Sequence, residues 1–313
     1  MRWHLCVEGP GAVGLAVALA LALGAANRAE AQNRGAYPLG MTATSAGTLP
    51  AAGFTYANQL IFYSRDEAKD DDGNTLPVSG KNSVLMDMNT ITCVSGFRVL
   101  GARYAAAATI PLAVNSLASD DLGVTKGGAG LADSYYIPAI LGWSGEDTFI
   151  KAFYGFLAPT GKFEAGADDN VGSGYWTHTI ASGQTFHFTS SRALTFSALQ
   201  MYEWHTTQEG TGVHPGDTFE LDSSLLGTLE NSEEFRLQAG PAGYLQRQTT
   251  AKTGPGVDAA EKEERYAVNA LGLAASGAFP KARASVTLKV FKEFENRATY
   301  QGYSVQLLGV IGL

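Results

Sequence analysis

The chain has 313 residues and a formal net charge of −8, with few charged residues for its length (17%) and 37 glycines. An acidic balance argues against nucleic-acid or heparin-like partners, because these need a basic surface. Since 45% of the residues are hydrophobic, the chain is not expected to be disordered. Strands that alternate apolar and polar residues, joined by glycine-rich turns, suit this composition.

The first residues have the pattern of a secretory signal peptide. Arg2 gives a positive start, an apolar stretch covers 11–26, and the small residues Ala29 and Ala31 precede Gln32. This pattern predicts a Sec-type signal peptide that is removed on export. Beyond it, no apolar stretch is long enough for a membrane-spanning helix.

The rest of the chain is expected to form one domain after a short leader. Removal of the signal peptide leaves Cys93 as the remaining cysteine, so we expect no internal disulfide. The expected divisions are a signal peptide at 1–31, a flexible leader at 32–52 and an outer-membrane β-barrel at 53–313.

Two aromatic-rich runs, at 134–143 and 148–157, flank a four-residue turn at 144–147. A tilted β-strand of about 9–11 residues crosses a bilayer core, whereas a helix needs about 20. Turn-forming residues at both ends therefore favour a β-hairpin. Lys151 lies in the middle of the second run, where a charge is tolerated only on a side that faces water. The hairpin thus looks like one wall of a membrane barrel.

Ten further runs alternate in the same way, and long polar loops alternate with short turns between them. This loop pattern is typical of outer-membrane barrels. The sequence predicts an all-β fold, an antiparallel up-and-down transmembrane β-barrel of about 12 strands whose first and last strands are neighbours. A soluble β-sandwich is the alternative, but aromatic residues near the ends of the runs favour the barrel. The ten runs are 53–65, 83–97, 102–114, 175–188, 193–204, 216–229, 235–247, 265–279, 281–291 and 303–313.

Three prolines complicate this interpretation. Pro111, Pro138 and Pro241 lie inside predicted strands, where they cannot donate a ladder hydrogen bond. Either bulges occur at these positions or the strands are shorter than predicted, and the sequence leaves both open.

Several short motifs are similar to one known family. GLAD (130–133), IPAILGW (137–143), APTG (158–161) and GYW (174–176) follow in an order that resembles the "putative MetA-pathway of phenol degradation" family of SphA-like outer-membrane proteins. The earlier RVLGA (98–102) resembles part of the preceding hairpin of that family. The resemblance implies an exported outer-membrane barrel of a Gram-negative bacterium, associated with uptake of aromatic or other hydrophobic compounds. It brings no catalytic residues.

Charged and aromatic residues on the more polar side of the runs are candidates to line the lumen. A lysine or arginine that faced lipid at the bilayer midplane would cost about 2–4 kcal/mol. Whether opposite charges pair and plug the lumen, or line a permeation path, stays open at this point. The candidates are Asp87, Arg103, Lys151, Glu203, Glu220, Asp222, Arg236, Arg283, Lys289, Phe149, Phe153, Tyr244 and Phe291.

Other motifs have simpler explanations. The glycines of 128–130 lack the third glycine and the following helix of a dinucleotide site, and the acidic run at 70–74 lacks the spacing of a calcium loop. The four later histidines lack the spacing of a helical zinc site. His187 and Ser190 are candidates for a hydrolase pair, without a G-x-S-x-G motif. We expect no cofactor and no metal.

The function expected from these observations is an outer-membrane channel for passive uptake of hydrophobic or aromatic small molecules, such as phenol-type compounds. The alternatives are a non-transporting barrel with a structural or adhesive envelope role, and an outer-membrane hydrolase. Expected partners are outer-membrane lipid and lipopolysaccharide, hydrophobic small molecules and the barrel-assembly machinery. The alternating last strand resembles the signal of that machinery, although it ends in Leu313 where most such signals end in Phe.

Overall fold

The computed structural model describes residues 34–120, 123–188, 191–257, 262 and 264–313, so the predicted signal peptide lies outside the described residues. Residues 35–313 form one compact unit. Its strands are β1 (Gly53–Lys69), β2 (Gly80–Val99), β3 (Ala102–Ser119), β4 (Val124–Lys126), β5 (Ala129–Leu131), β6 (Ser134–Ser144), β7 (Thr148–Ala158), β8 (Thr177–His187), β9 (Leu194–His205), β10 (Thr218–Asn231), β11 (Arg236–Gln248), β12 (Ala267–Phe279), β13 (Ala284–Glu293) and β14 (Thr299–Gly312), with a 3-10 turn η1 (Pro280–Ala282).

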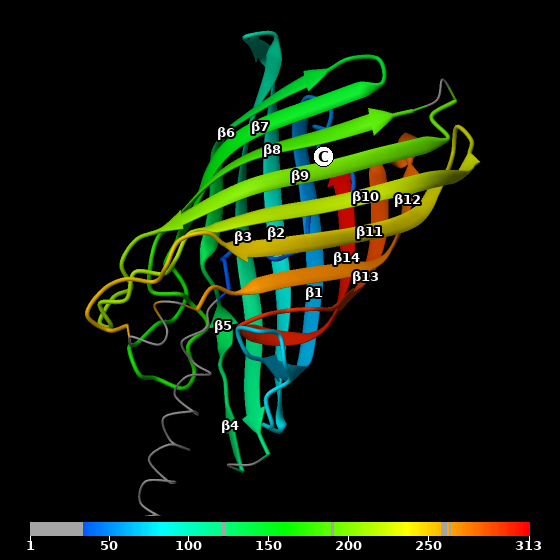
Figure 1. The fold of residues 1–313 in the computed structure, drawn as a ribbon. Coiled ribbons are helices and arrows are strands. Elements are labelled where there is room, and N and C mark those ends of the chain that lie inside the picture. Colours follow the sequence, from blue (N-terminus) through cyan, green and yellow to red (C-terminus); the bar gives the residue numbers. More distant parts are fainter. Residues whose placement is uncertain (1–33, 121–122, 189–190, 258–261, 263) are drawn as a thin grey trace, which may run out of the picture. The chain divides into compact units, whose positions relative to one another are not determined.

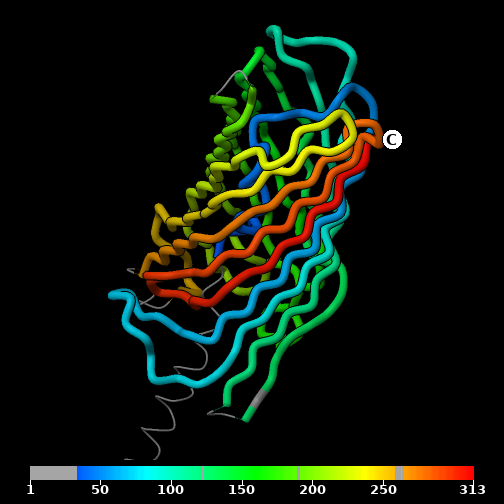
Figure 2. Tube along the Cα trace, turned by 90° about the vertical axis from the view of Figure 1, so that its right-hand side faces the viewer, coloured from blue at the N-terminus to red at the C-terminus, as the bar shows by residue number. Residues whose placement is uncertain are grey.

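Twelve long strands close into an antiparallel barrel (Figure 1), and the short β4 and β5 pair only with β3. Each long strand pairs with its neighbours in the chain, and β14 pairs with β1 from Thr55↔Gly312 to Lys69↔Thr299. Figure 2 shows this seam, where the last strand (red) lies beside the first (blue). The predicted barrel of about 12 strands, closed by its first and last strands, is confirmed.

The two rims of the barrel differ, as the loop pattern predicts. Tight turns join β2 to β3, β6 to β7 and β12 to β13, and Leu100 and Gly101 take positive φ values of 50° and 78° in the first of them. The end of β14 lies on the same rim, since Leu313 N–H donates to the Phe54 carbonyl over 2.9 Å. The longer connections, such as 159–176 and 206–217, lie on the opposite rim.

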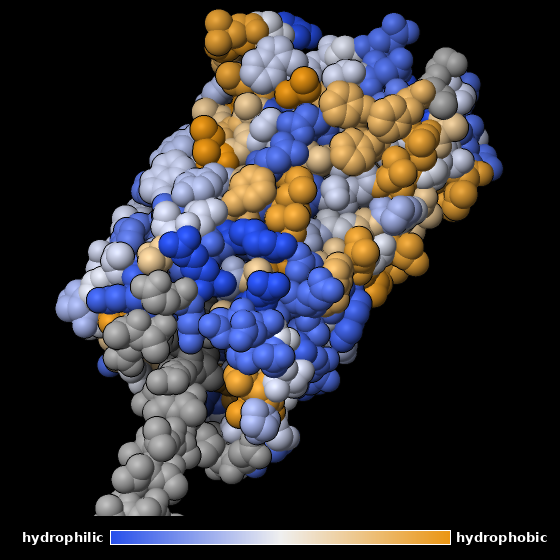
Figure 3. Space-filling model, in the orientation of Figure 1, coloured by the Kyte–Doolittle hydropathy of each residue, from blue (hydrophilic) through white to orange (hydrophobic). Residues whose placement is uncertain are grey.

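The strands carry apolar residues outward and polar residues inward. In β13, Leu288 and Val290 are exposed, whereas Lys289 and Phe291 are buried. Successive side chains of a strand point to opposite faces, so this alternation produces an apolar outer wall and a mixed lumen. Figure 3 shows hydrophobic residues gathered over the upper part of the outer wall and hydrophilic residues below them, towards the long loops.

No helix among the described residues is long and apolar enough to cross a membrane.

The three strand prolines behave differently. The pairing of β6 is irregular around Pro138 on both of its edges, which is the predicted bulge. Pro111 and Pro241 instead stay in register, opposite Met88 in β2 and Leu273 in β12. On the other edge of each strand the ladder skips the proline: β10 has no partner for Pro241, and Pro111 lies between the residues of β3 that pair with β6 and with β5. The missing N–H is therefore placed where the ladder is interrupted.

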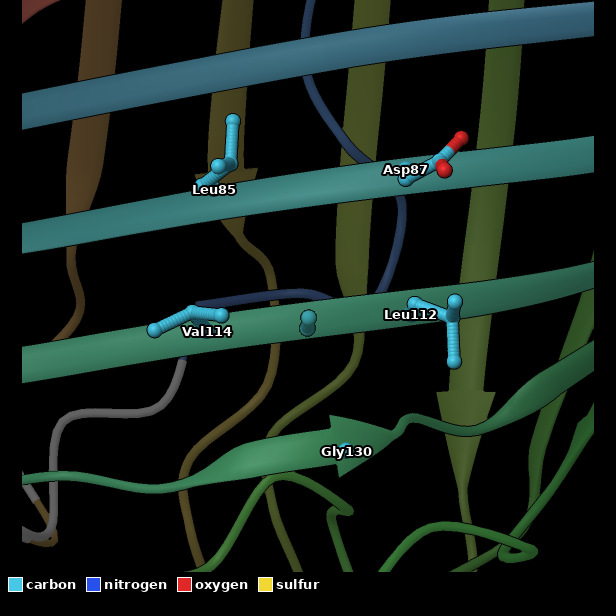
Figure 4. A pocket seen from close by; sticks show the side chains of 6 residues that line it. Leu85, Asp87, Leu112, Val114 and Gly130 are labelled. Atoms are coloured by element: carbon cyan, nitrogen blue, oxygen red, sulfur yellow. The ribbon is translucent and has the colours of Figure 1, made fainter.

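The residues before β1 enter the barrel, which corrects the expected flexible leader for its described part. Tyr37, Leu39, Ala43 and Ala46 are all buried, and Tyr37 and Ala43 lie in the main hydrophobic cluster with residues of the wall. Figure 4 shows this segment (dark blue) on the lumen side of β2 and β3. We call residues 35–48 the plug.

Candidate functional site

Most of the predicted lumen residues do face inward. They alternate with exposed residues of their strands and share the parity of the buried ones. Those on the inward faces are Arg103, Phe149, Lys151, Phe153, Glu203, Glu220, Asp222, Arg236, Tyr244, Lys289 and Phe291.

Asp87 is not among them, so the prediction that it faces the lumen is wrong. It shares the side of Leu85 and Ile91, which are exposed on the outer wall, while Met88 is buried on the inward side. Asp87 is accommodated by polar neighbours on the same outer face, since the Asn58 amide donates to its Oδ1 over 2.5 Å. A second amide, from Asn89, lies 3.3 Å from the same oxygen.

Arg283 is the other exception. It follows η1 with a φ of 51°, one residue before β13 begins, and is therefore a turn residue on the tight-turn rim. Its guanidinium lies 3.4 Å from the Leu313 carbonyl, at the end of the last strand. The prediction placed it inside a strand because the tight turn between β12 and β13 was drawn too short.

Glu203 of β9 holds the start of the plug by its backbone. The Tyr37 N–H donates to Oε1 and the Ala36 N–H to Oε2, each over 2.8 Å. Glu203 is fully buried. Hydrogen bonds from backbone amides to a charged acceptor are stronger than neutral ones, so this carboxylate fixes the chain at these two residues.

Asp222 and Lys289 hold the next turn of the plug from opposite sides of its backbone. Asp222 accepts hydrogen bonds from Gly40 N–H (2.9 Å), Thr42 N–H (3.1 Å) and the Tyr37 hydroxyl (2.7 Å). Lys289 Nζ donates to the Gly40 carbonyl (2.7 Å) and the Met41 carbonyl (2.6 Å). The Asp222 carboxylate thus binds backbone amides and the Lys289 ammonium binds backbone carbonyls, so each end of the local backbone dipole meets a complementary charge.

The rest of the plug is held by neutral groups and one arginine. Ser224 donates to the Ala43 carbonyl over 2.7 Å, and Gly47 N–H donates to Thr185 Oγ1 over 3.0 Å. Where the chain leaves the lumen, Arg103 donates to the Pro50 carbonyl over 2.9 Å. The wall therefore contacts the plug mainly through the backbone of the plug.

Aromatic side chains of the wall pack against the same segment. The Tyr244 and Phe291 rings lie 5.0 Å apart between centroids, and Phe153 packs against the buried cluster that includes Leu39. Gly40 has a φ of +80°, and a Cβ there would lie 2.8 Å from the Phe291 ring. Glycine is required at this point by both its backbone conformation and the close approach of the ring.

A second carboxylate, Glu220 of β10, lies beside Glu203. Thr218 Oγ1 is 3.1 Å from Glu203 Oε2 and 2.5 Å from Glu220 Oε1. The Gln246 amide donates to Glu220 Oε1 over 3.0 Å. Glu220 Oε2 and Gln246 Oε1 are buried without a hydrogen-bond partner.

Nearer the long loops, Glu293 ends β13 in a second polar network. Its Oε1 lies 3.7 Å from Arg65 Nε and accepts from the Tyr244 hydroxyl (3.2 Å), while its Oε2 accepts from the Asn296 amide (3.0 Å). Glu293, Thr218 and Gln246 were not among the residues predicted from the sequence. The available signal was parity: Glu293 shares that of Lys289 in β13, Thr218 that of Glu220 in β10, and Gln246 that of Tyr244 in β11.

The outer wall carries a groove of about 250 Å³ over β2, β3 and β5. Figure 4 shows Leu85, Leu112 and Val114 along it, with the carboxylate of Asp87 at one end and directed towards β1. Since these residues are on the outward parity, the groove faces the membrane and not the lumen.

Polar contacts order the long loops. Asp133 accepts from Gly161 N–H over 3.0 Å and from Ser173 N–H over 2.8 Å, which joins both ends of the β7–β8 loop. In that loop the Lys162 ammonium donates a hydrogen bond to Asp169 and lowers the pKa of its carboxyl.

The structure describes one member of the predicted hydrolase pair. His187 Nδ1 is 2.9 Å from Thr195 Oγ1, and its ring meets Phe149 edge-on. Ser190 lies outside the described residues. Within the described ranges, no group of three or more His, Cys, Asp or Glu residues is placed to hold a metal ion.

Comparison with known families decides what kind of barrel this is. The model of the family described as "Putative MetA-pathway of phenol degradation" matches residues 65–308, which covers ten of the twelve long strands in full, most of β14 and the last five residues of β1. The chain belongs to this family. The resemblance expected from the GLAD, IPAILGW and APTG motifs is therefore confirmed. The comparison with curated proteins finds no match.

Solved structures of other outer-membrane proteins have a fold similar to that of this chain. The COG4313 outer membrane channel from Pseudomonas putida F1 is 12% identical, with a TM-score of 0.71, covering 86% of this chain and 98% of that chain. The β domain of the Bordetella autotransporter BrkA is 10% identical, with a TM-score of 0.50 over 84% of this chain and 100% of that one. The closed barrel and its apolar outer wall make this family member an outer-membrane protein.

Proposed function

We propose that the protein lets hydrophobic or aromatic small molecules, of the phenol type, cross the outer membrane through its lumen once the plug is displaced. The observation that carries this proposal is the aromatic inner surface of Phe153, Tyr244 and Phe291, which is covered by a separate segment made largely of small residues. When the plug moves, these rings become a lining that favours apolar and aromatic solutes.

The family description, which names phenol degradation, supports the same class of solute. The charged residues of the wall bear on the seated state. Glu203, Asp222 and Lys289 hydrogen-bond to the plug backbone, so the plug has to move before a solute can pass through the lumen.

A non-transporting barrel with a structural role is the second candidate, and the plug itself favours it. In this conformation residues 35–48 occupy the lumen and hydrogen-bond to several strands of the wall. The two candidates differ in whether the plug has to move, and this difference can be tested directly.

The test locks the plug to the wall. Ala43 and Ser224 are in contact through a 2.7 Å hydrogen bond, so A43C with S224C should form a disulfide in a C93A background. Intact Gram-negative cells that express each variant are given N-phenylnaphthylamine, a hydrophobic aromatic probe that fluoresces on reaching lipid. A43C alone in C93A is the matched control.

Under the proposal, the reduced double variant and the control admit the probe several-fold faster than cells with an empty vector, and oxidation returns only the double variant to the vector rate. Equal rates in all states would favour the structural barrel instead. A chromogenic β-lactam cleaved in the periplasm reports general leakage, and its entry should not change.

A further inference from the structure

The carboxylates Glu203 and Glu220 have too few hydrogen-bond donors around them for both to be ionised. Both approach Thr218 Oγ1, at 3.1 Å and 2.5 Å, but a hydroxyl has a single hydrogen to donate. Glu203 is otherwise satisfied by two plug amides and Glu220 Oε1 by the Gln246 amide. Glu220 Oε2 is left without a donor, although it is buried. If both groups were ionised, one contact to Thr218 would be a repulsion between two oxygens.

Nothing nearby supplies the missing positive charge. Within the described part of the chain, neither carboxylate has a lysine or arginine partner, and both are at most 1% exposed. Lys289 is engaged with Asp222 and the plug carbonyls. The ionisable groups that interact electrostatically with the pair are acidic or phenolic: Asp222, Tyr135, Tyr175 and Tyr266. The buried imidazole of His205, two residues along β9 from Glu203, has its Nδ1 2.8 Å from Thr177 Oγ1.

We propose that Glu203 and Glu220 share one proton while the plug is seated, and that this pair is a pH-sensitive latch on the plug. Two buried carboxylates that both contact the Thr218 hydroxyl cannot both ionise without a large cost, so one proton binds between them. The inference rests on the proposed displacement of the plug, which it regulates.

Loss of the proton acts on the plug through Glu203. When the proton leaves to lumen water, the two negative charges repel each other and each requires hydration that the seated plug excludes. Glu203 is the acceptor for Ala36 and Tyr37, so its displacement breaks both hydrogen bonds. The seated state binds one proton more than the displaced state, so acid favours seating and alkali favours release, by about tenfold per pH unit over the titration range.

Accessibility of the plug tests this proposal without measuring transport. In the C93A background, A43C places a thiol at a position that is fully buried when the plug is seated. The full chain in lipid vesicles reacts with a water-soluble maleimide from pH 5 to 9. Each rate is divided by that of the unfolded chain at the same pH, which removes the effect of thiol ionisation.

The normalised rate is expected to rise with pH by up to about tenfold per unit. Adding Glu220→Gln should keep the normalised rate low at every pH, because the amide is neutral and supplies the missing hydrogen-bond donor. Glu230→Gln is the matched control, since Glu230 is exposed on the same strand, and it should keep the pH profile. A difference in gel migration between unheated and boiled samples of each variant shows that the variant has folded.

Three results would overturn the latch. They are a rate that does not depend on pH, an E220Q variant that keeps the full pH dependence, and a rate that responds to calcium or a chelator instead of pH. If E220Q does not fold, the pH dependence of the A43C rate alone decides whether the latch proposal stands. A flat profile combined with probe entry that oxidation blocks would reject the latch and leave the proposed function standing.

Discussion

Lys289 is a buried charge whose stability depends on the groups around it. It is fully buried in the middle of β13, between the exposed Leu288 and Val290. Burial of an ammonium is tolerated only with a charged or hydrogen-bonding partner, and here Asp222 and the two plug carbonyls serve. The residue therefore couples the wall to the plug and has no simple replacement.

Replacing Lys289 by methionine should destabilise the protein, because it leaves Asp222 buried without its cation. Removing one partner of a buried pair costs about 3–5 kcal/mol. Urea unfolding from phospholipid vesicles measures the change. Lys292→Met is the matched control on the same strand, where the side chain is exposed and the change should be within about 0.5 kcal/mol. Equal losses in the two variants would contradict the assigned role.

The sequence predicted the inward direction of Lys289 correctly and that of Asp87 wrongly, for one reason. A charge in a strand was assigned to the lumen because a lipid-facing charge is costly. Asp87 escapes this rule because Asn58 and Asn89 give it hydrogen-bond donors on the outer wall. Those neighbours come partly from an adjacent strand, and the register that joins Leu60 to Asp87 could not be known from the sequence.

At the scale of elements, the alternation of apolar and polar residues was enough to predict where the strands are. All twelve runs became strands, since a ten-residue alternating run bounded by turns has few other stable forms in lipid. The lengths were less predictable. β2 and β3 are 20 and 18 residues long, because on the side of the long loops β2 begins three residues before its predicted start and β3 ends five residues after its predicted end. The Pro138 bulge was foreseen as one of two options.

The seam strand β14 provides a test of the outward face. Leu307 is exposed and lies in register with Leu60 of β1 and Leu288 of β13, which makes an apolar row across three strands. Leu307→Arg should cost about 2–4 kcal/mol, because the charge then faces lipid near the midplane. Leu313→Arg at the rim should cost about 0–1 kcal/mol. Folding titrations into vesicles would contradict this outer face if the two costs were equal.

At the scale of the whole molecule, closure was predictable and the plug was not. The plug has no periodicity, and its partners are far away in the chain: Tyr37 and Glu203 are 166 residues apart, and Gly40 and Lys289 are 249 apart. Small polar residues punctuated by proline look like any leader. Only the closed wall creates the buried acids and the lysine that give such a segment somewhere to bind.

Closure itself predicts a cross-link between the two ends of the barrel. In a C93A background, L60C with L307C should oxidise to a disulfide, because the two positions are direct partners across the seam. L60C with L288C is the control, since Leu288 lies one strand further away. Migration on a non-reducing gel reads out the product. An open sheet would leave both pairs reduced.

At Met41 and Thr42 the wall binds the main chain, through the Met41 carbonyl and the Thr42 amide, whereas at Tyr37 it also holds the side chain, whose hydroxyl donates to Asp222. Variation at Met41 or Thr42 leaves the amide and carbonyl in place, whereas a bulkier residue at Gly40 would strike Phe291. Residues 41 and 42 are therefore expected to vary among homologous barrels, while Tyr37, Gly40 and the acids and lysine that receive the main chain are kept.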